Sequence, residues 1–179
     1  MNLDSILNKL WIDYIIQNPS AGKIHNLFIK EGEDVVNDHI AFRTLDVPEI
    51  NIDILAKLFI SNGYVPGGEY FFKDKHLYAK HFESERDENA PRIFISQLIL
   101  PECSQFLQKT LTDALDKSDK SLYLSEALIF SGSIFNPLSF VINDILRIES
   151  DYAEWFYDFG FRAYLFTVSI NSLKNSKNI

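Results

Sequence analysis

The chain has little of what marks secreted, membrane-bound or nucleic-acid-binding proteins. Its single cysteine, Cys103, excludes an intrachain disulfide and is typical of a reducing compartment such as the cytoplasm. No apolar run approaches the roughly 20 residues of a membrane-spanning helix. The first residues lack a basic segment, so no signal peptide is expected. With 17 basic against 25 acidic residues, neither nucleic acid nor an anionic membrane is expected as a partner.

What the chain does have is apolar and aromatic residues in regular patterns. Hydrophobic residues make up 46% of the 179 residues, so we expect a globular protein with a sizeable core. Helical spacing predicts a helix over 4–17 and a second one that is capped by Ser20 and ends at Gly32. The sequence then predicts a strand over 35–45 and a helix that ends at Asn62-Gly63.

Three further strands are predicted over 69–73, 76–83 and 92–100, with Pro66-Gly67-Gly68 as a turn before them. A helix from Cys103 and a strand over 161–171 follow. We therefore expect four parts: N-terminal helices over 1–34, a βαβββ unit with its following helix over 35–118, a helical connector over 119–160, and the first strand of a second, incomplete unit over 161–179. The predicted class is α+β. By fold-level analogy, such units build the vicinal-oxygen-chelate folds, in which two units enclose a metal.

The segment Asp38-His39-Ile40-Ala41-Phe42-Arg43-Thr44 is the strongest candidate for a functional site. Strand alternation puts His39 and Arg43 on one face, about 13 Å apart at Cα if each residue rises roughly 3.3 Å. A small anion can then lie between a metal on the imidazole and the guanidinium fork. The alternative is a histidine at a sheet edge beside a surface arginine. Asp38 either orients His39 or caps the start of the strand.

Other polar residues fit weaker hypotheses. His76 and His81 are five residues apart and face opposite ways on a continuous strand, so joint metal binding would need a bulge. His81 and Glu83 share a face, where a metal pair and a solvated hairpin are both compatible with the pattern. Cys103 is expected in the core.

Four segments together resemble one enzyme family. The segment 38–44 is similar to its first motif, and Phe94-Ile95-Ser96-Gln97-Leu98 to its FISEL strand, with Gln97 at the glutamate. Residues 150–155, SDYAEW, resemble a helix of the family, and residues 162–171 resemble its RANHFTVSIN pattern. On these motifs the chain resembles the front portion of the 2-oxoadipate dioxygenase/decarboxylase family, which is related to glyoxalases.

The resemblance implies an iron(II) enzyme that converts 2-oxoadipate and dioxygen to 2-hydroxyglutarate and carbon dioxide in lysine breakdown. Two histidines and a glutamate hold the iron in that family, which leaves positions for a chelating 2-oxo acid and dioxygen. His39 matches the first ligand and Arg43 the arginine that engages the substrate carboxylate. Asp38 and Gln97 are then expected to support the ligands through hydrogen bonds.

The sequence departs from the family pattern at two adjacent positions. The second histidine falls on Leu165 and the preceding asparagine on Tyr164, while the glutamate ligand lies in the part of the family that follows Ile179. We expect a truncated, impaired member that binds Fe(2+) or no metal. The alternatives are a non-catalytic module that binds a small 2-oxo dicarboxylic acid, favoured by Leu165, and a homodimer in which two chains each bring His39 to a shared site.

Overall fold

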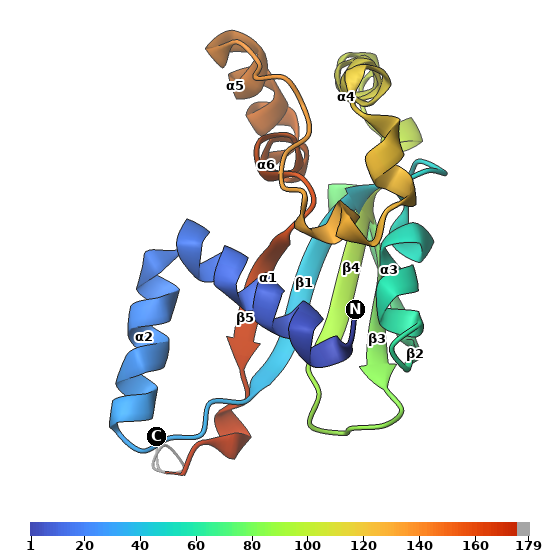
Figure 1. Cartoon of the computed structure of the whole chain (residues 1–179). Helices are drawn as coiled ribbons and strands as arrows, with labels where there is room; N and C mark the ends of the chain where they lie inside the picture. The colour runs from blue at the N-terminus through green and yellow to red at the C-terminus, as the bar shows by residue number, and fades with distance from the viewer. Residues whose placement is uncertain (175–179) are drawn as a thin grey trace.

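The computed structural model describes residues 1–174 and is built around one five-stranded sheet with strand order β2-β3-β4-β1-β5 (Figure 1). The strands are β1 (Asn37–Leu45), β2 (Tyr64–Phe72), β3 (Leu77–Ser84), β4 (Arg92–Leu98) and β5 (Ala163–Val168). β1 and β4 run parallel, and the other neighbours run antiparallel.

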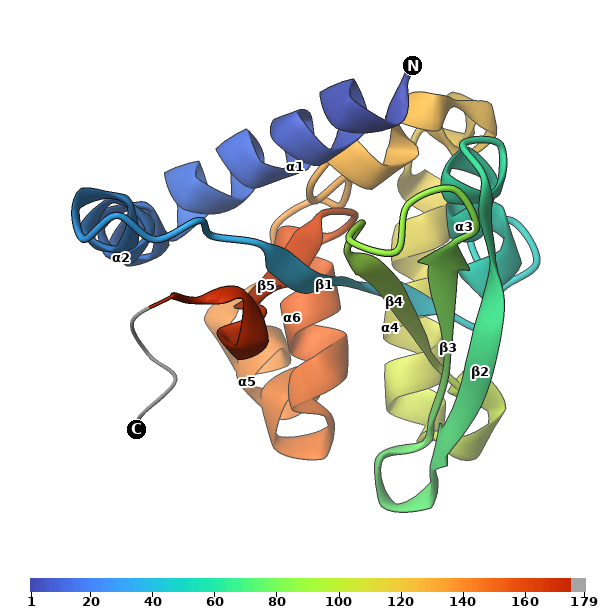
Figure 2. The ribbon, with the colours of Figure 1, turned by 90° about the horizontal axis from the view of Figure 1, so that it is seen from below.

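Six α-helices surround the sheet in the described part of the chain. They are α1 (Leu3–Gln17), α2 (Pro19–Lys30), α3 (Ile52–Ile60), α4 (Gln105–Lys117), α5 (Phe140–Glu149) and α6 (Asp151–Phe159). Figure 1 shows α4, α5 and α6 gathered beyond the end of the sheet at which β1 finishes. Figure 2, seen from below, places α2 and the β2–β3 hairpin at opposite sides of the molecule. None of the helices that the structure describes combines the length and apolar character needed to cross a membrane.

The core lies between α3 and one face of the sheet. Phe42 on β1 and Phe59 on α3 are both buried, and their ring centroids are 5.6 Å apart. The side chain of Asn51 accepts a hydrogen bond from the Ile54 amide and so caps the start of α3. The order β1-α3-β2-β3-β4 is the predicted βαβββ unit, so the α+β class is confirmed.

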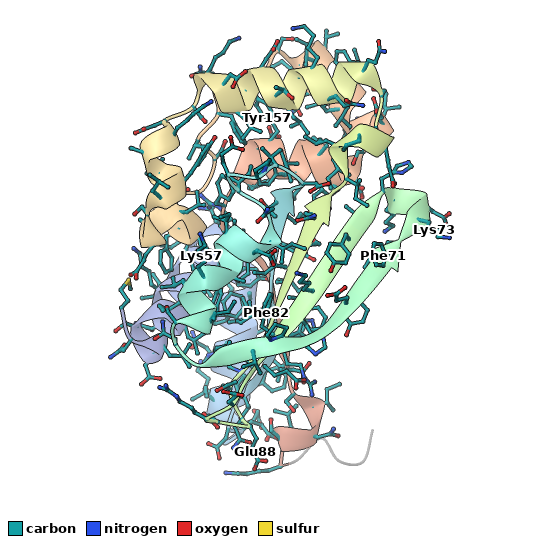
Figure 3. The ribbon with its side chains drawn as sticks, turned by 90° about the vertical axis from the view of Figure 1, so that its right-hand side faces the viewer. Lys57, Phe71, Lys73, Phe82, Glu88 and Tyr157 are labelled. Atoms are coloured by element: carbon teal, nitrogen blue, oxygen red, sulfur yellow. The ribbon has the colours of Figure 1, made fainter. Side chains whose placement is uncertain are left out.

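The predicted turn at Pro66-Gly67-Gly68 is wrong, because β2 begins at Tyr64 and runs through it with a register shift between Pro66 and Gly68. An edge strand tolerates a proline, and a bulge absorbs the irregularity. Gly67 has a packing role as well, since a Cβ there would overlap the ring of His81 on β3. Figure 3 shows this hairpin, with Phe71 on it and Lys73 near its tip.

Two predicted boundaries also differ. The cap of the second helix is Asn18 rather than Ser20, and Pro19 takes the first helical position, where its missing N–H costs nothing. The last strand is shorter than predicted and covers Ala163–Val168. It pairs antiparallel with β1, so the end of the described chain joins the sheet of the first unit as an edge strand.

Candidate functional site

The motif on β1 presents His39 and Arg43 to the face of the sheet opposite α3. The β1–β4 register places His39 beside Arg92 and Arg43 beside Ser96, whereas Phe42 points into the core. The predicted alternation along the strand is therefore present. His39 and Arg43 share this face with Phe94 of β4, whose ring centroid is 5.1 Å from that of His39.

His39 is held through one ring nitrogen. Its Nδ1 lies 2.8 Å from Oδ2 of Asp38 and 2.8 Å from Oγ1 of Thr167 on β5. A proton on Nδ1 satisfies the carboxylate, and this tautomer leaves the lone pair on Nε2. The imidazole side chain is 28% exposed. This contact fits one of the two roles that the sequence left open for Asp38, that of orienting His39, and a metal on Nε2 stays a prediction.

Arg43 lies inside a set of aromatic rings. Its guanidinium carbon is 4.8 Å from the ring centroid of Tyr152, 4.9 Å from that of Trp155 and 4.5 Å from that of Tyr164. Its Nε is buried and has no hydrogen-bond partner among the described residues. No carboxylate of residues 1–174 forms an ion pair with it. Arg43 is therefore a half-buried cation that forms no ion pair with a described residue and whose Nε is screened from water.

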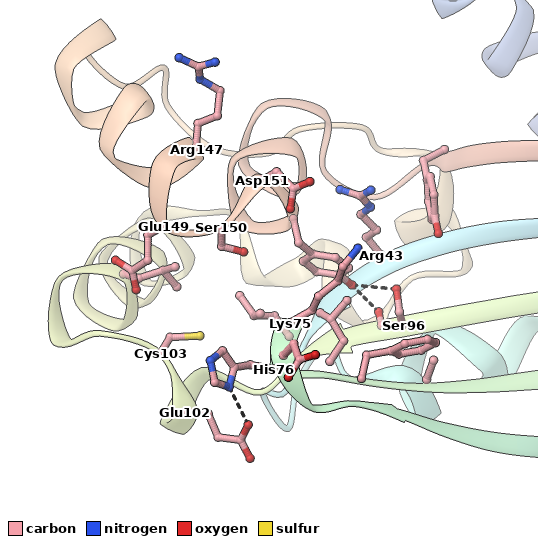
Figure 4. Close-up of a pocket in the computed structure, with 18 of the residues that line it drawn as sticks. Arg43, Lys75, His76, Ser96, Glu102, Cys103, Arg147, Glu149, Ser150 and Asp151 are labelled. Carbon is pink, nitrogen blue, oxygen red and sulfur yellow. Dashed lines mark hydrogen bonds and ion pairs between the residues drawn. The ribbon is translucent and has the colours of Figure 1, made fainter.

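A cavity of about 910 Å³ opens beside Arg43, within the range of roughly 300–1,000 Å³ typical of small-molecule sites. Figure 4 shows Arg43 on one side of it and His76, Glu102 and Cys103 on another. The strands contribute Phe94 and Ser96, and the start of α6 contributes Ser150, Asp151 and Tyr152. His39 is not among its lining residues. The cavity therefore lies at the Arg43 end of the motif.

Tyr152 ties α6 to the sheet and was not predicted as a site residue. Its hydroxyl accepts a hydrogen bond of 3.0 Å from the Thr44 amide and lies 2.6 Å from the carbonyl oxygen of Ser96. Complete burial raises the pKa of Tyr152 above its usual range, so the hydroxyl keeps its proton. The signal available in the sequence was the spacing of Tyr152 and Trp155, three residues apart on one helix face.

Leu165 lies on the same face as His39 and Arg43, because it pairs with Ala41 across the β1–β5 ladder. The register shifts at this point, so Tyr164 falls in the irregularity and reaches Arg43. Within residues 1–174, no three His, Cys, Asp or Glu side chains are grouped so that they could hold a metal ion. The described residues therefore do not supply the ligand set that the resemblance implies.

Gln97 lies on the other face of the sheet from His39. Its Oε1 accepts a hydrogen bond of 3.1 Å from the amide of Ile52, the first residue of α3, and its Nε2 donates to Asp46. These contacts fix the start of α3 against β4. Gln97 makes structural contacts here, and its support of a metal ligand stays a prediction.

Of the remaining histidine candidates, His81 stacks at 5.2 Å on the same Phe94 ring that His39 contacts, whereas His76 makes a separate contact. His81 lies 2.9 Å from the hydroxyl of Tyr70 and 3.4 Å from Glu83, which also pairs with Arg92 at 2.8 Å. His76 precedes β3 in a left-handed turn, with its Nδ1 2.9 Å from Glu102. His81 and Glu83 thus share a face as predicted, with Arg92 as the cation beside the carboxylate.

Cys103 lies at the mouth of the cavity and packs against the core. Burial, together with the nearby carboxylates of Glu149 and Glu102, raises the pKa of its thiol to about 11. The thiol is therefore protonated at neutral pH and is a poor nucleophile.

Comparison with known proteins extends over nearly the whole chain. An Arabidopsis thaliana protein, chloroplastic 2-oxoadipate dioxygenase/decarboxylase, is 30% identical over 190 residues, which include 97% of this chain. The chain spans about half the length of the curated relatives it matches, 50% of the Arabidopsis protein and 47% of an Oryza sativa one.

Several solved structures share the fold of this chain. A Shewanella frigidimarina protein provisionally named a hydrolase superposes with a TM-score of 0.92 at 40% identity, over 99% of this chain and 69% of its own. The hydroxyglutarate synthase of Oryza sativa in complex with 2-oxoadipate superposes with a TM-score of 0.86 at 28% identity, over 96% of this chain and 58% of its own. A Ralstonia eutropha protein provisionally assigned to the glyoxalase superfamily superposes with a TM-score of 0.77 at 15% identity, over 89% of this chain and 59% of its own. At this identity the likeness shows the fold alone.

A family model also matches residues 10–133, which include the strand of His39 and Arg43. Its description is 2-oxoadipate dioxygenase/decarboxylase. The model covers more than half of the chain, and the curated relative in Arabidopsis aligns with almost all of it. The chain therefore belongs to the 2-oxoadipate dioxygenase/decarboxylase family.

Proposed function

We propose that this chain recognises a carboxylate of a small 2-oxo dicarboxylic acid through Arg43, as part of a 2-oxoadipate dioxygenase/decarboxylase. The observation that carries the proposal is the uncompensated guanidinium beside the cavity of about 910 Å³. A half-buried cation is stabilised when an anion reaches it, and arginine binds a carboxylate through two parallel N–H···O bonds. The rice relative solved with 2-oxoadipate supports this class of ligand.

The residues around the cavity favour a short acid with an apolar middle. Phe94 and Leu107 line it, and a chain of methylene groups can pack against them. Lys75 lines the same cavity and offers a second positive charge. The chain's own contribution to the reaction is then to bind the acid, to orient it by the carboxylate on Arg43, and to keep water from its apolar part.

Iron(II) is the metal that the family resemblance implies, and it would supply the oxygen chemistry. His39 fits such a metal, because Asp38 and Thr167 hold Nδ1 and leave Nε2 for a ligand bond. Leu165 does not fit, since an aliphatic side chain has no donor atom. One imidazole among the described residues does not hold iron(II) against water, so we assign no reaction step to iron here.

Leu165 favours a second candidate function: a binding module that takes up the acid without a metal. In that case the cavity and Arg43 are sufficient for binding, and His39 is dispensable. The predicted homodimer with a shared metal site is a third arrangement, and it requires both His39 side chains to face one cavity. Light scattering of the purified protein measures its mass and tests that arrangement directly.

Calorimetric titration of 2-oxoadipate into purified protein tests the proposal. We expect binding that Arg43→Leu weakens by about 10- to 100-fold, because a charged hydrogen bond contributes about 1.5–3 kcal/mol. Arg86→Leu is the matched control, since Arg86 is exposed and lies outside the cavity. Equal affinity of the Arg43→Leu variant and the unchanged chain would contradict the proposal.

A second experiment separates the enzyme from the metal-free module. The titration is repeated with chelator and then with iron(II), and oxygen uptake is recorded with 2-oxoadipate present. Bound iron together with oxygen consumption supports the dioxygenase. Equal affinity with and without iron, and no oxygen uptake, supports the binding module.

A further inference from the structure

Three aromatic rings from two distant parts of the chain meet around Arg43. Tyr152 and Trp155 come from one face of α6, and Tyr164 comes from the start of β5. Their ring centroids lie 4.8, 4.9 and 4.5 Å from the guanidinium carbon. Each distance is within the roughly 6 Å over which an aromatic ring attracts a cation. The rings therefore form a cage on the anion-binding side chain.

The rings of the cage are themselves held in place. The Tyr152 hydroxyl contacts the Thr44 amide at 3.0 Å and the Ser96 carbonyl at 2.6 Å, so this ring is fixed to β1 and β4. The ring of Trp155 packs edge-on against Tyr164 at 5.5 Å and stacks on Phe159 at 5.1 Å. A side chain whose neighbours are fixed loses little freedom when it binds a ligand.

The cage determines how the guanidinium can be approached. Aromatic carbon covers much of the group, and its Nε is buried without a partner among the described residues. The charge is stabilised by the ring faces and yet has no carboxylate of its own. What remains for a ligand is the N–H edge beside the cavity, which is the edge that a carboxylate binds in its own plane.

We propose that Tyr152, Trp155 and Tyr164 are positioning residues that hold Arg43 for an incoming carboxylate. This proposal rests on the proposed function for its ligand, although the cage itself is a property of the free protein. Tyr164 is the most informative of the three, because the family pattern has asparagine there. The asparagine has no ring, so this chain has a means of holding Arg43 that the pattern lacks.

The cage is tested first without any ligand. In a nitrogen-15 NMR spectrum the Nε–H signal of Arg43, identified by its disappearance in Arg43→Lys, is expected to be displaced by the ring currents. Tyr164→Leu moves the signal towards its ordinary position, whereas Tyr164→Phe keeps it displaced. Tyr78→Leu is the matched control, because Tyr78 packs on Phe71 and is not in the cage. An unchanged signal in Tyr164→Leu overturns the cage.

Binding is then measured by tryptophan fluorescence in the Trp11→Phe background, in which Trp155 is the one remaining tryptophan. With 2-oxoadipate as the probe, Tyr164→Leu and Tyr164→Asn are expected to bind about 3- to 30-fold more weakly, and Tyr164→Phe within about twofold of the parent. If the Tyr164 hydroxyl rather than its ring supported binding, the phenylalanine variant would be as weak as the leucine variant, and this result contradicts the proposal. If no variant binds 2-oxoadipate but the Nε–H signal still responds, the cage stands and the proposed function fails.

Discussion

At the scale of single residues, the site is defined by Arg43, whose guanidinium forms no ion pair within residues 1–174. The guanidinium of Arg43 lies among aromatic rings. Burial and the nearby Asp158 raise the pKa of the Glu154 carboxyl, and Arg43 opposes that rise only weakly. His39 differs from Arg43 in that its Nδ1 has polar partners, the side chains of Asp38 and Thr167. These two residues on one strand face therefore differ in what they can bind. Arg43 can bind an anion, and His39 can bind a ligand through its Nε2.

Replacing Leu165 tests what separates this chain from a metal-binding one. Leu165→His adds a second imidazole on the face that carries His39, since Leu165 pairs with Ala41. We expect cobalt(II) binding, followed by its visible absorption, to become on the order of tenfold tighter, or about 1.4 kcal/mol. Leu165→Gln is the control without an imidazole. If His39→Ala removes the gain in cobalt(II) affinity, both histidines hold the metal. If Leu165→His gives no gain in affinity, the result counts against this placement of Leu165.

The thiol of Cys103 gives a pH-dependent prediction. Its pKa of about 11 in the folded protein is above the ordinary value, and only the thiolate reacts with iodoacetamide. The alkylation rate should therefore be low at pH 8 and should rise steeply between about pH 9 and pH 11. In 6 M guanidinium chloride the same rise should occur near the ordinary thiol pKa of about 8.5. Mass spectrometry of the timed reaction measures both rates, and identical profiles would refute the assignment.

At the scale of elements, α6 joins the sheet to the cavity. Ser150 caps the helix through a hydrogen bond from the Ala153 amide, and Tyr152 on the first turn reaches both β1 and β4. The same turn lines the cavity. A shift of α6 would therefore move the cage and the cavity wall together.

The β2–β3 hairpin depends on a glycine at a close approach of two strands. Gly67→Ala places a methyl group against His81, so either the ring or the bulge must move. We expect a loss of about 1–3 kcal/mol in the free energy of unfolding, measured by urea denaturation. Gly22→Ala is the matched control. Gly22 lies inside α2, and a Cβ there would meet Ile15 of α1 at 3.5 Å, an ordinary contact, so this change should stabilise the protein by about 0.5–1 kcal/mol.

If instead Gly67→Ala changes neither the stability nor the chemical shift of His81, the His81 ring does not approach β2 this closely. An altered chemical shift of His81 with unchanged stability would indicate that the ring turns away at little cost. The two glycines therefore separate a packing effect from a general effect of the alanine side chain.

At the scale of the whole molecule, binding and folding are linked, because the cavity is lined by the sheet, by η2 (Leu100–Glu102) with the loop before α4, and by α5 and α6. A ligand that binds only the folded form raises stability by about 2.7 kcal/mol at 100 times its dissociation constant. For a chain of this size we expect 2-oxoadipate to raise the melting temperature by roughly 5–10 °C. Differential scanning calorimetry measures the shift, and Arg43→Leu should abolish most of it. An equal shift in both proteins would mean that the acid binds elsewhere.

The division of the chain into four parts at residues 34, 118 and 160 stays a prediction, as does a cytoplasmic location. The structure does show that β5 belongs to the same sheet as the first unit. The segment 175–179, predicted as the end of the last part, lies outside the described residues.

The sequence alone determined the features that depend on near neighbours along the chain. Period-two alternation put His39 and Arg43 on one face of β1, and apolar spacing gave the helices, because both follow from backbone geometry. The strand through Pro66-Gly67-Gly68 was predicted as a turn, because the close packing of His81 against it comes from another strand.

Only the tertiary structure decided what surrounds Arg43. Tyr152 and Trp155 are visible in the sequence as two aromatic residues on one helix face, and Tyr164 as a departure from a family pattern. Their meeting on one guanidinium depends on α6 docking against β1 and β4 and on the irregular β1–β5 pairing. No local period encodes such contacts, because they arise from packing between segments that lie far apart along the chain.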